Sequence, residues 1–356
     1  MLKSEKPTRS DEIRTDRKQS LQLSRRTIVA GAAAAFGLSA AGALLPGRAS
    51  AQSKTVIRIG TVVNVDHPEN VGARKIKELV EARSKGALEV QIFTDSRIGD
   101  QRNMVENLRN GVQEMTWVTV GFFGSYEPIL NIVESGYLFR DSQHSYKVFD
   151  GPFGNEVRAL VEKHGVKLLG FYEAGMRHTT NSARPIRTPA DLNGLKIRTP
   201  QAKYHLQTLK MMGANPVAMA FPEVYAALQQ KVIDGQENPL SNIFFAKFYE
   251  VNKFVSLTGH LHLTHMVMYS DKLWARLSQE HQGIVRQAVI ESQEAQRKAV
   301  RDDDARLLGE IKKTGAAVND ADRDAFRKAV LPLRDEAQKE FGDKARQWFD
   351  MIEKTT

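Results

Sequence analysis

The alternation of short strand-like and helix-like segments limits the fold of this chain more than any other feature. Residues 55–63 alternate in hydropathy and are rich in β-branched side chains, which predicts a strand. The same patterns predict helices over 71–86 and 102–110 and further strands over 88–94 and 115–120. Strands that alternate with helices favour a mostly parallel sheet, so we expect an α/β fold.

The segments that follow these strands are candidate pocket walls, because ligands of parallel sheets bind beyond the carboxyl ends of the strands. Three such segments, 64–70, 95–101 and 121–126, are expected to be loops. The third contains the aromatic and glycine-rich run Gly121-Phe122-Phe123-Gly124.

A second α/β unit is predicted to begin near residue 175, after a strand over 166–173. Pro189, which follows Thr188, indicates a helix start. A helix over 203–212 and a strand over 216–220 follow.

Residues 277–314 contain no proline and predict a single helix of more than 30 residues, or about 45–50 Å. One amphipathic face without sustained heptads favours a strut between two lobes over a coiled-coil arm. We expect the run Asp302-Asp303-Asp304 to lie on its solvated face.

Residues 1–51 have the features of an export signal. Arg25-Arg26 precedes an apolar run over 30–45, and the small residues Ala49-Ser50-Ala51 follow. This order predicts export by the twin-arginine route with cleavage near Ala51. The alternative is a short membrane anchor, but the run is short and weakly apolar for a span.

The signal also explains most of the basic charge. Residues 1–51 hold nine Lys or Arg and four Asp or Glu, a net +5 of the chain's +9, so that +4 remains after cleavage. We therefore expect neither nucleic-acid binding nor membrane insertion of the mature protein.

Several kinds of site are excluded or disfavoured. Cysteine is absent, which excludes disulfides, thiolate metal sites and a cysteine nucleophile. No nucleophile-elbow, zinc-protease or phosphate-loop motif occurs, so no enzyme activity is expected. His260, His262 and His265 suggest a metal site, but no fourth ligand is evident, and we expect no metal and no cofactor.

The stretch from Gly175 to Leu240 points to an anion-binding site. Arg198 ends a strand-like run immediately before Thr199-Pro200, where a guanidinium is well placed to bind a carboxylate with two parallel hydrogen bonds. The turn Asp234-Gly-Gln-Glu-Asn-Pro adds short polar side chains. Together they predict binding of a small organic anion.

With these motifs in view, the chain resembles the solute-binding subunits of TRAP (tripartite ATP-independent periplasmic) transporters. The resemblance covers the leader, the first strand, the Ile98-Gly99-Asp100 turn, the stretch 175–240 and the long late helix. It implies a two-lobed periplasmic-binding-protein fold braced by a long helix. The lobes would be residues 52–174 with 264–303, and 175–263 with 304–356.

The family's site residues fall on positions of this chain. The resemblance implies that Arg198 grips the ligand carboxylate, that Arg177 contributes to this, that Asn238 bonds the carboxylate or holds the arginine, and that Phe221 packs on the ligand. In the first lobe, Gln101 and Thr119, with Val62, stand where sialic-acid members carry polar or acidic contacts, and His67 is a further candidate. These departures favour a smaller hydroxy acid, a sugar acid, a dicarboxylate or an aromatic acid.

The function implied is that of a periplasmic, monomeric binding protein that closes over an organic acid and delivers it to TRAP membrane permease subunits. Two alternatives stay open at this point. One is a subunit of the same fold that reports to a sensor kinase, and the other is a periplasmic enzyme acting on a sugar acid.

Overall fold

The structure is a computed structural model, and it describes residues 54–356. The export signal predicted for residues 1–51 lies outside the described residues. In the part of the chain that is described, no helix combines the length and the apolar character needed to cross a membrane.

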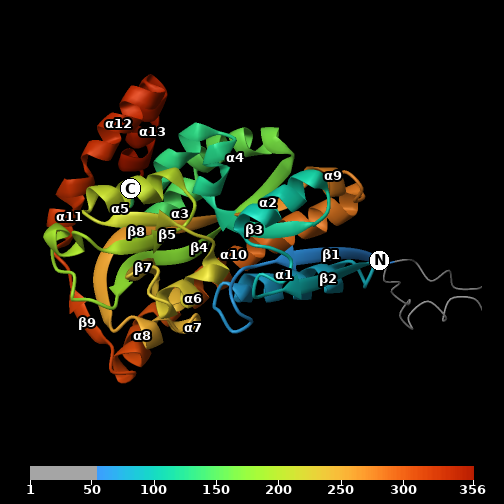
Figure 1. The fold of residues 1–356 in the computed structure, drawn as a ribbon. Coiled ribbons are helices and arrows are strands. Elements are labelled where there is room, and N and C mark those ends of the chain that lie inside the picture. Colours follow the sequence, from blue (N-terminus) through green and yellow to red (C-terminus); the bar gives the residue numbers. More distant parts are fainter. Residues whose placement is uncertain (1–53) are drawn as a thin grey trace, which may run out of the picture. The chain divides into compact units, whose positions relative to one another are not determined.

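One sheet of nine strands runs through the described residues (Figure 1). The strands are β1 (Thr55–Gly60), β2 (Leu88–Phe93), β3 (Met115–Thr119), β4 (Val166–Asn181), β5 (Lys196–Thr199), β6 (Asn215–Ala218), β7 (Gly235–Pro239), β8 (Phe254–Ser270) and β9 (Ala317–Asp320).

The strand order is β2-β1-β3-β8-β4-β7-β5-β6, and β9 pairs with β8 off this path. Pairing is parallel at both ends, among β1, β2 and β3 and among β5, β6 and β7. The long strands β4 and β8 join these ends and pair antiparallel with each other and with β7 and β3. The α/β prediction is therefore confirmed, whereas the sheet is mixed rather than mostly parallel, because the two connecting strands run in opposite directions.

Helix boundaries follow local capping. At the start of α2 (Gln101–Asn110), the Asp100 side chain accepts a hydrogen bond from the Asn103 backbone N–H at 2.8 Å. The same helix ends at Gly111, whose φ of 74° suits glycine. The α-helices are α1 (Asn70–Arg83), α2 (Gln101–Asn110), α3 (Ser142–Asp150), α4 (Pro152–Val161), α5 (Lys203–Met211), α6 (Val224–Gln229), α7 (Leu240–Phe245), α8 (Phe248–Val251), α9 (Asp271–Trp274), α10 (Gln279–Lys313), α11 (Arg323–Val330), α12 (Pro332–Phe341) and α13 (Asp343–Lys354). The 3₁₀ helices are η1 (Val120–Ser125), η2 (Pro128–Glu134), η3 (Glu162–His164), η4 (Pro189–Leu192) and η5 (Phe221–Glu223).

Some local predictions are wrong. The predicted turn at 234–239 is instead the strand β7, which covers Gly235–Pro239. The segment 121–126 is not a loop but largely the 3₁₀ helix η1, because Phe123 turns into the core and is fully buried. The strand predicted over 166–173 continues to Asn181. Gly175, with a φ of 109°, lies at one of the register shifts that let β4 bend and continue.

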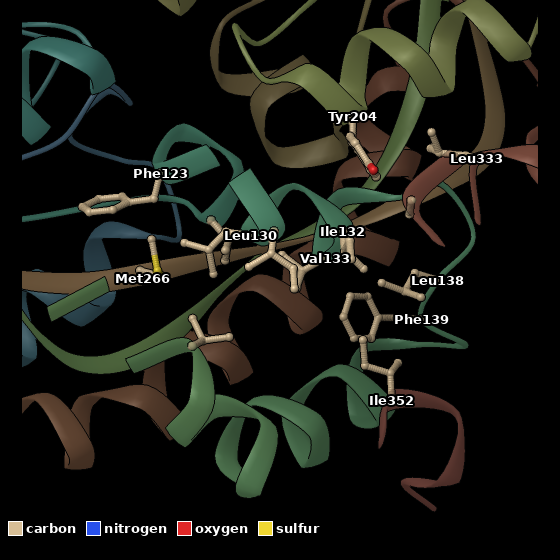
Figure 2. Close-up of a cluster of buried hydrophobic side chains, with 14 of the residues drawn as sticks. Phe123, Leu130, Ile132, Val133, Leu138, Phe139, Tyr204, Met266, Leu333 and Ile352 are labelled. Atoms are coloured by element: carbon tan, nitrogen blue, oxygen red, sulfur yellow. The ribbon is translucent and has the colours of Figure 1, made fainter. Parts of the chain in front are cut away.

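The largest hydrophobic cluster lies beside the middle of the sheet (Figure 2). Phe139 and Ile352 lie together in it, although they are far apart in the chain. The Trp348 ring packs edge-on against Phe153 with 4.9 Å between centroids, which fixes the C-terminal helix α13 on α4. The lobe boundaries predicted from the resemblance, 52–174 with 264–303 and 175–263 with 304–356, remain a prediction.

The predicted long helix is confirmed as α10, with 35 residues or about 50 Å. Near its start, Val285 and Val289 join the cluster that β1, β3 and α1 form. Near its end, Leu307 and Ile311 join a separate cluster with α6 and α7. One helix therefore packs against two hydrophobic cores.

Asp304 lies between these anchors and is not solvated as predicted. Its Oδ1 atom is buried without a hydrogen-bond partner among the described residues. Burial, with the charges of Glu173 and Asp303, raises its pKa to about 7. Asp302 is 60% exposed at its side chain and fits the prediction.

We therefore expect Asp304→Asn to stabilise the protein in a pH-dependent way. Because the folded-state pKa is raised, ionisation of wild-type Asp304 costs stability progressively from about pH 4 to about pH 7. The variant should gain on the order of 2–4 kcal/mol over wild type at pH 8 and little at pH 4, measured by denaturant unfolding. Asp302→Asn is the control, and an equal gain from both variants would contradict the assignment.

Candidate functional site

A pocket lies among the ends of the parallel strands and the two long strands. It encloses about 390 Å³ of space that no protein atom occupies, part of it continuous with solvent. Its lining residues are Val62, Val63, Glu69, Gln101, Thr119, Arg177, Arg198, Pro200, Phe221, Asn238, Asn242, Leu263 and His265.

A second cavity of about 400 Å³ adjoins this pocket and shares four of its residues, Val62, Val63, Phe221 and Asn242. It is further lined by Asn64, His67, Asp95, Phe245 and Ala246. We call the first the inner pocket and the second the outer cavity.

The structure brings the predicted site residues together. Six of them line the inner pocket, namely Arg198, Arg177, Asn238, Phe221, Gln101 and Thr119. His67 lines the outer cavity instead. Of the three predicted wall segments, 64–70 and 95–101 contribute to these cavities. Segment 121–126 contributes to neither, since Phe123 is in the core.

Arg198 on β5 is 2% exposed and lines the inner pocket. Its Nε and Nη2 atoms both donate to the carbonyl of Met219, at 3.0 and 2.6 Å, which fixes the guanidinium plane. Within residues 54–356, no carboxylate lies within salt-bridge distance of Arg198, and Nη1 has no hydrogen-bond partner. Burial, together with the charge of Arg177, lowers the Arg198 pKa to about 9. The side chain is thus a buried cation without a counterion.

Arg177 on β4 has its counterion. Its Nη2 donates to Glu237 Oε1 at 2.8 Å and to the Glu237 carbonyl at 2.6 Å, and its Nε donates to Oε2. Both residues are 1% exposed. Although burial alone would raise the Glu237 pKa, Arg177 and the neighbouring histidines hold it well below its usual value. The strand pairing of β4 with β7 creates this ion pair.

The same carboxylate is fixed from further sides. Thr199 donates to Glu237 Oε1 at 2.7 Å, and His260 Nε2 lies 3.0 Å from Oε2. His205 Nε2 lies 2.9 Å from Glu134, which also accepts from the Thr119 hydroxyl. Burial alone would lower the His205 pKa, but Glu134 raises it. His205 Nδ1 lies 3.5 Å from the Thr199 hydroxyl, so a buried polar network links Thr119 on β3 to Arg177 on β4.

Asn238 and Phe221 complete the wall around Arg198. The Asn238 amide nitrogen donates to Gln236, and the residue is 2% exposed. The Phe221 ring centroid lies 6.0 Å from Arg198 Cζ, so the ring covers the guanidinium where the inner pocket meets the outer cavity.

Three polar pocket residues were not predicted. Glu69 Oε2 accepts from Trp117 Nε1 at 3.0 Å and lies 3.5 Å from His265 Nδ1. Asn242 Oδ1 lies 3.2 Å from His67 Nε2. The sequence signal that could have identified Glu69 is its position in the predicted wall segment 64–70. His265 joins the pocket only because it pairs with Thr119 across β3 and β8.

The three β8 histidines contact three different carboxylates. His260 contacts Glu237, His262 lies 3.2 Å from Glu173, and His265 faces Glu69. Over residues 54–356, no group of three or more potential metal ligands is close enough to hold an ion.

Known proteins are similar to this chain in sequence and in fold. The DctP family model, for bacterial extracellular solute-binding proteins of family 7, matches residues 59–340. The 2,3-diketo-L-gulonate-binding periplasmic protein YiaO of Escherichia coli is 36% identical over 275 residues, which are 77% of this chain and 84% of YiaO.

Two crystal structures are similar at a TM-score of 0.82. One is a TRAP periplasmic solute-binding protein from Polaromonas sp. JS666 bound to D-erythronate, with 36% identity over 85% of this chain and 99% of that chain. The other is the sugar acid binding protein DctPAm from Advenella mimigardefordensis in complex with galactonate, with 30% identity over 85% of this chain and 99% of that chain. The predicted two-lobed periplasmic-binding-protein fold with a long helix is confirmed by these similarities.

The geometry predicts a large stability effect for Glu237→Gln. The substitution leaves two buried guanidiniums without a compensating charge, so we expect a loss of about 3–5 kcal/mol. The control is Glu340→Gln, which removes an exposed ion pair with Lys203 and should cost at most about 1 kcal/mol. Chemical denaturation measures the free energy of unfolding of both variants. Similar losses would show that the buried Arg177–Glu237 pair contributes no more to stability than an exposed ion pair.

Proposed function

Because the chain belongs to the DctP family, the bacterial extracellular solute-binding proteins of family 7, we propose that it captures a small sugar acid in the periplasm and delivers it to the permease subunits of a TRAP transporter. The family consists of binding proteins and not of enzymes. The three relatives described above are named for, or bound to, diketogulonate, erythronate and galactonate. Each of these is a monocarboxylate with several oxygen substituents, which supports a ligand of this class.

One observation carries the proposal, namely the buried and uncompensated charge of Arg198 in the inner pocket. Burying a cation without a partner is unfavourable, and a bound carboxylate removes this cost. The guanidinium presents its free Nη1 edge with the plane already fixed by Met219. A ligand carboxylate thus meets an oriented donor in a buried site, where shielding from bulk water strengthens the ion pair.

The other predicted residues take supporting roles in this proposal. Arg177 adds positive potential, although Glu237 neutralises most of it. Asn238 orients the ligand carboxylate, and Phe221 excludes water from the ion pair between that carboxylate and Arg198. Gln101 and Thr119 contact the ligand from the opposite wall, and His67 borders its entry from the outer cavity.

We further propose that the two lobes close over the ligand. Hydrogen bonds already join the two walls in this structure: Asn64 to the Phe245 carbonyl at 2.9 Å, His67 to Asn242 at 3.2 Å, and Arg102 to Gln201 at 3.3 Å. A ligand that contacts both walls binds the closed form more tightly and shifts the population toward it. Twin-arginine export and a monomeric state are part of the same proposal.

Arg198→Lys tests the proposal, because it keeps the charge and loses the planar donor edge. We expect the affinity for sugar acids to fall by about 10- to 100-fold, since a hydrogen bond to a charged group contributes about 1.5–3 kcal/mol. Calorimetry with erythronate and galactonate measures this. Arg346→Lys, on an exposed residue of α13, is the control. Unchanged affinity in Arg198→Lys would remove the arginine from the binding site.

A further inference from the structure

The inner pocket contains an acidic side chain, Glu69, that takes no part in the carboxylate binding proposed for Arg198. Glu69 is 1% exposed and lines the same pocket as Arg198. Its Oε2 atom is held by Trp117 Nε1 at 3.0 Å and lies near His265. Its Oε1 atom is buried and accepts no hydrogen bond from the described residues.

A second unpartnered polar atom lies beside it. His265 lines the inner pocket, and its Nδ1 also lacks a hydrogen-bond partner among residues 54–356. The His265 ring is 4% exposed, so bulk water does not satisfy this nitrogen. Leaving two buried polar atoms unpaired is unfavourable, which means that the pocket is complementary to a group that bonds both.

We propose that Glu69 and His265 form a hydroxyl-binding subsite, which makes the protein select hydroxylated monocarboxylates and reject dicarboxylates. A hydroxyl group that donates to Glu69 Oε1 accepts from His265 Nδ1 when that nitrogen carries the proton, and in the other tautomer a second ligand hydroxyl donates to Nδ1. An ammonium group offers no acceptor to a protonated Nδ1, and an aliphatic chain satisfies neither atom. This inference rests on the proposed function, because it places the ligand carboxylate at Arg198.

Charge explains the rejection of dicarboxylates. Glu69 is ionised, because His265, His67 and Trp117 outweigh the effect of burial and lower its pKa to about 2. A second ligand carboxylate would face this charge inside a buried pocket, where like charges repel strongly. The inner pocket thus has the uncompensated cation Arg198 and the anion Glu69, whose Oε2 atom already lies 3.5 Å from His265, and a polar but uncharged group suits the remaining Oε1 atom.

Matched ligands test the proposal. Galactonate and galactarate have the same six-carbon chain and differ by one terminal carboxylate, and erythronate and tartrate form the corresponding four-carbon pair. Hexanoate has the carboxylate without hydroxyls. By calorimetry, the wild-type protein should bind at least one of the two hydroxy monocarboxylates at least about tenfold more tightly than its dicarboxylate counterpart and than hexanoate.

Glu69→Gln is the decisive variant, because it keeps the size and one oxygen for Trp117 while it removes the charge. We expect the hydroxy monocarboxylate to bind about tenfold more weakly, and the preference over the dicarboxylate to fall toward one. The preference is the ratio of two dissociation constants measured on the same variant, so partial loss of folded protein does not change it. Thermal unfolding without ligand reports on stability separately. Glu78→Gln, 65% exposed on α1, should leave the ratio unchanged.

The outcomes separate this inference from the proposed function. If the acids bind and Arg198→Lys weakens them, but the wild-type ratio is near one or Glu69→Gln leaves it unchanged, the hydroxyl subsite is wrong and the function stands. Tighter binding of the zwitterion 6-aminohexanoate than of the hydroxy acids would also overturn the subsite. If no carboxylic acid binds the wild-type protein, both proposals fall.

Discussion

The pairing of only one of two buried arginines with a carboxylate is the interaction on which this site depends. Glu237 bonds Arg177 through its side chain and its carbonyl, and Thr199 and His260 hold the carboxylate in place. Arg198 lies outside this arrangement and, among residues 54–356, bonds only to the carbonyl of Met219. Protein groups therefore neutralise the charge of one guanidinium, Arg177, and leave the charge of the other, Arg198, uncompensated. The fold tolerates that uncompensated charge because it is confined to a small pocket that an anion can fill.

The rest of the pocket follows from where the sheet places its strand ends. The parallel strands at one end provide Glu69 and Gln101 in the segments after them, and those at the other end provide Arg198 and Phe221. The long strands β4 and β8 run between these ends and contribute Arg177 and His265. Polar residues of opposite charge thus come from different ends of one sheet. Under the proposed function, such a site would recognise the distribution of charge along a ligand as well as the presence of a carboxylate.

Most of the fold was predictable from sequence because it rests on local patterns. The strand at residue 55, the helix that ends at Gly111 and the 35-residue helix α10 all follow from hydropathy and capping. Their spatial partners were not predictable in this way. The Arg177–Glu237 ion pair needs β4 beside β7, and the approach of His265 to the pocket needs β3 beside β8. Residues 121–126 resemble a loop in composition, and only the packing of Phe123 decides otherwise.

The two contact faces of helix α10 must keep the same angular position around the helix axis as well as a fixed distance along it. Leu307 follows Val289 by 18 positions, which is five complete turns at 3.6 residues per turn, so both residues point to the same side of the helix. Inserting or deleting one residue between them would rotate one contact face by about 100° relative to the other. A change of about seven residues restores the angle but moves the cores about 10 Å relative to each other. The number of residues in this interval is therefore fixed by geometry, even where their identities are free to vary.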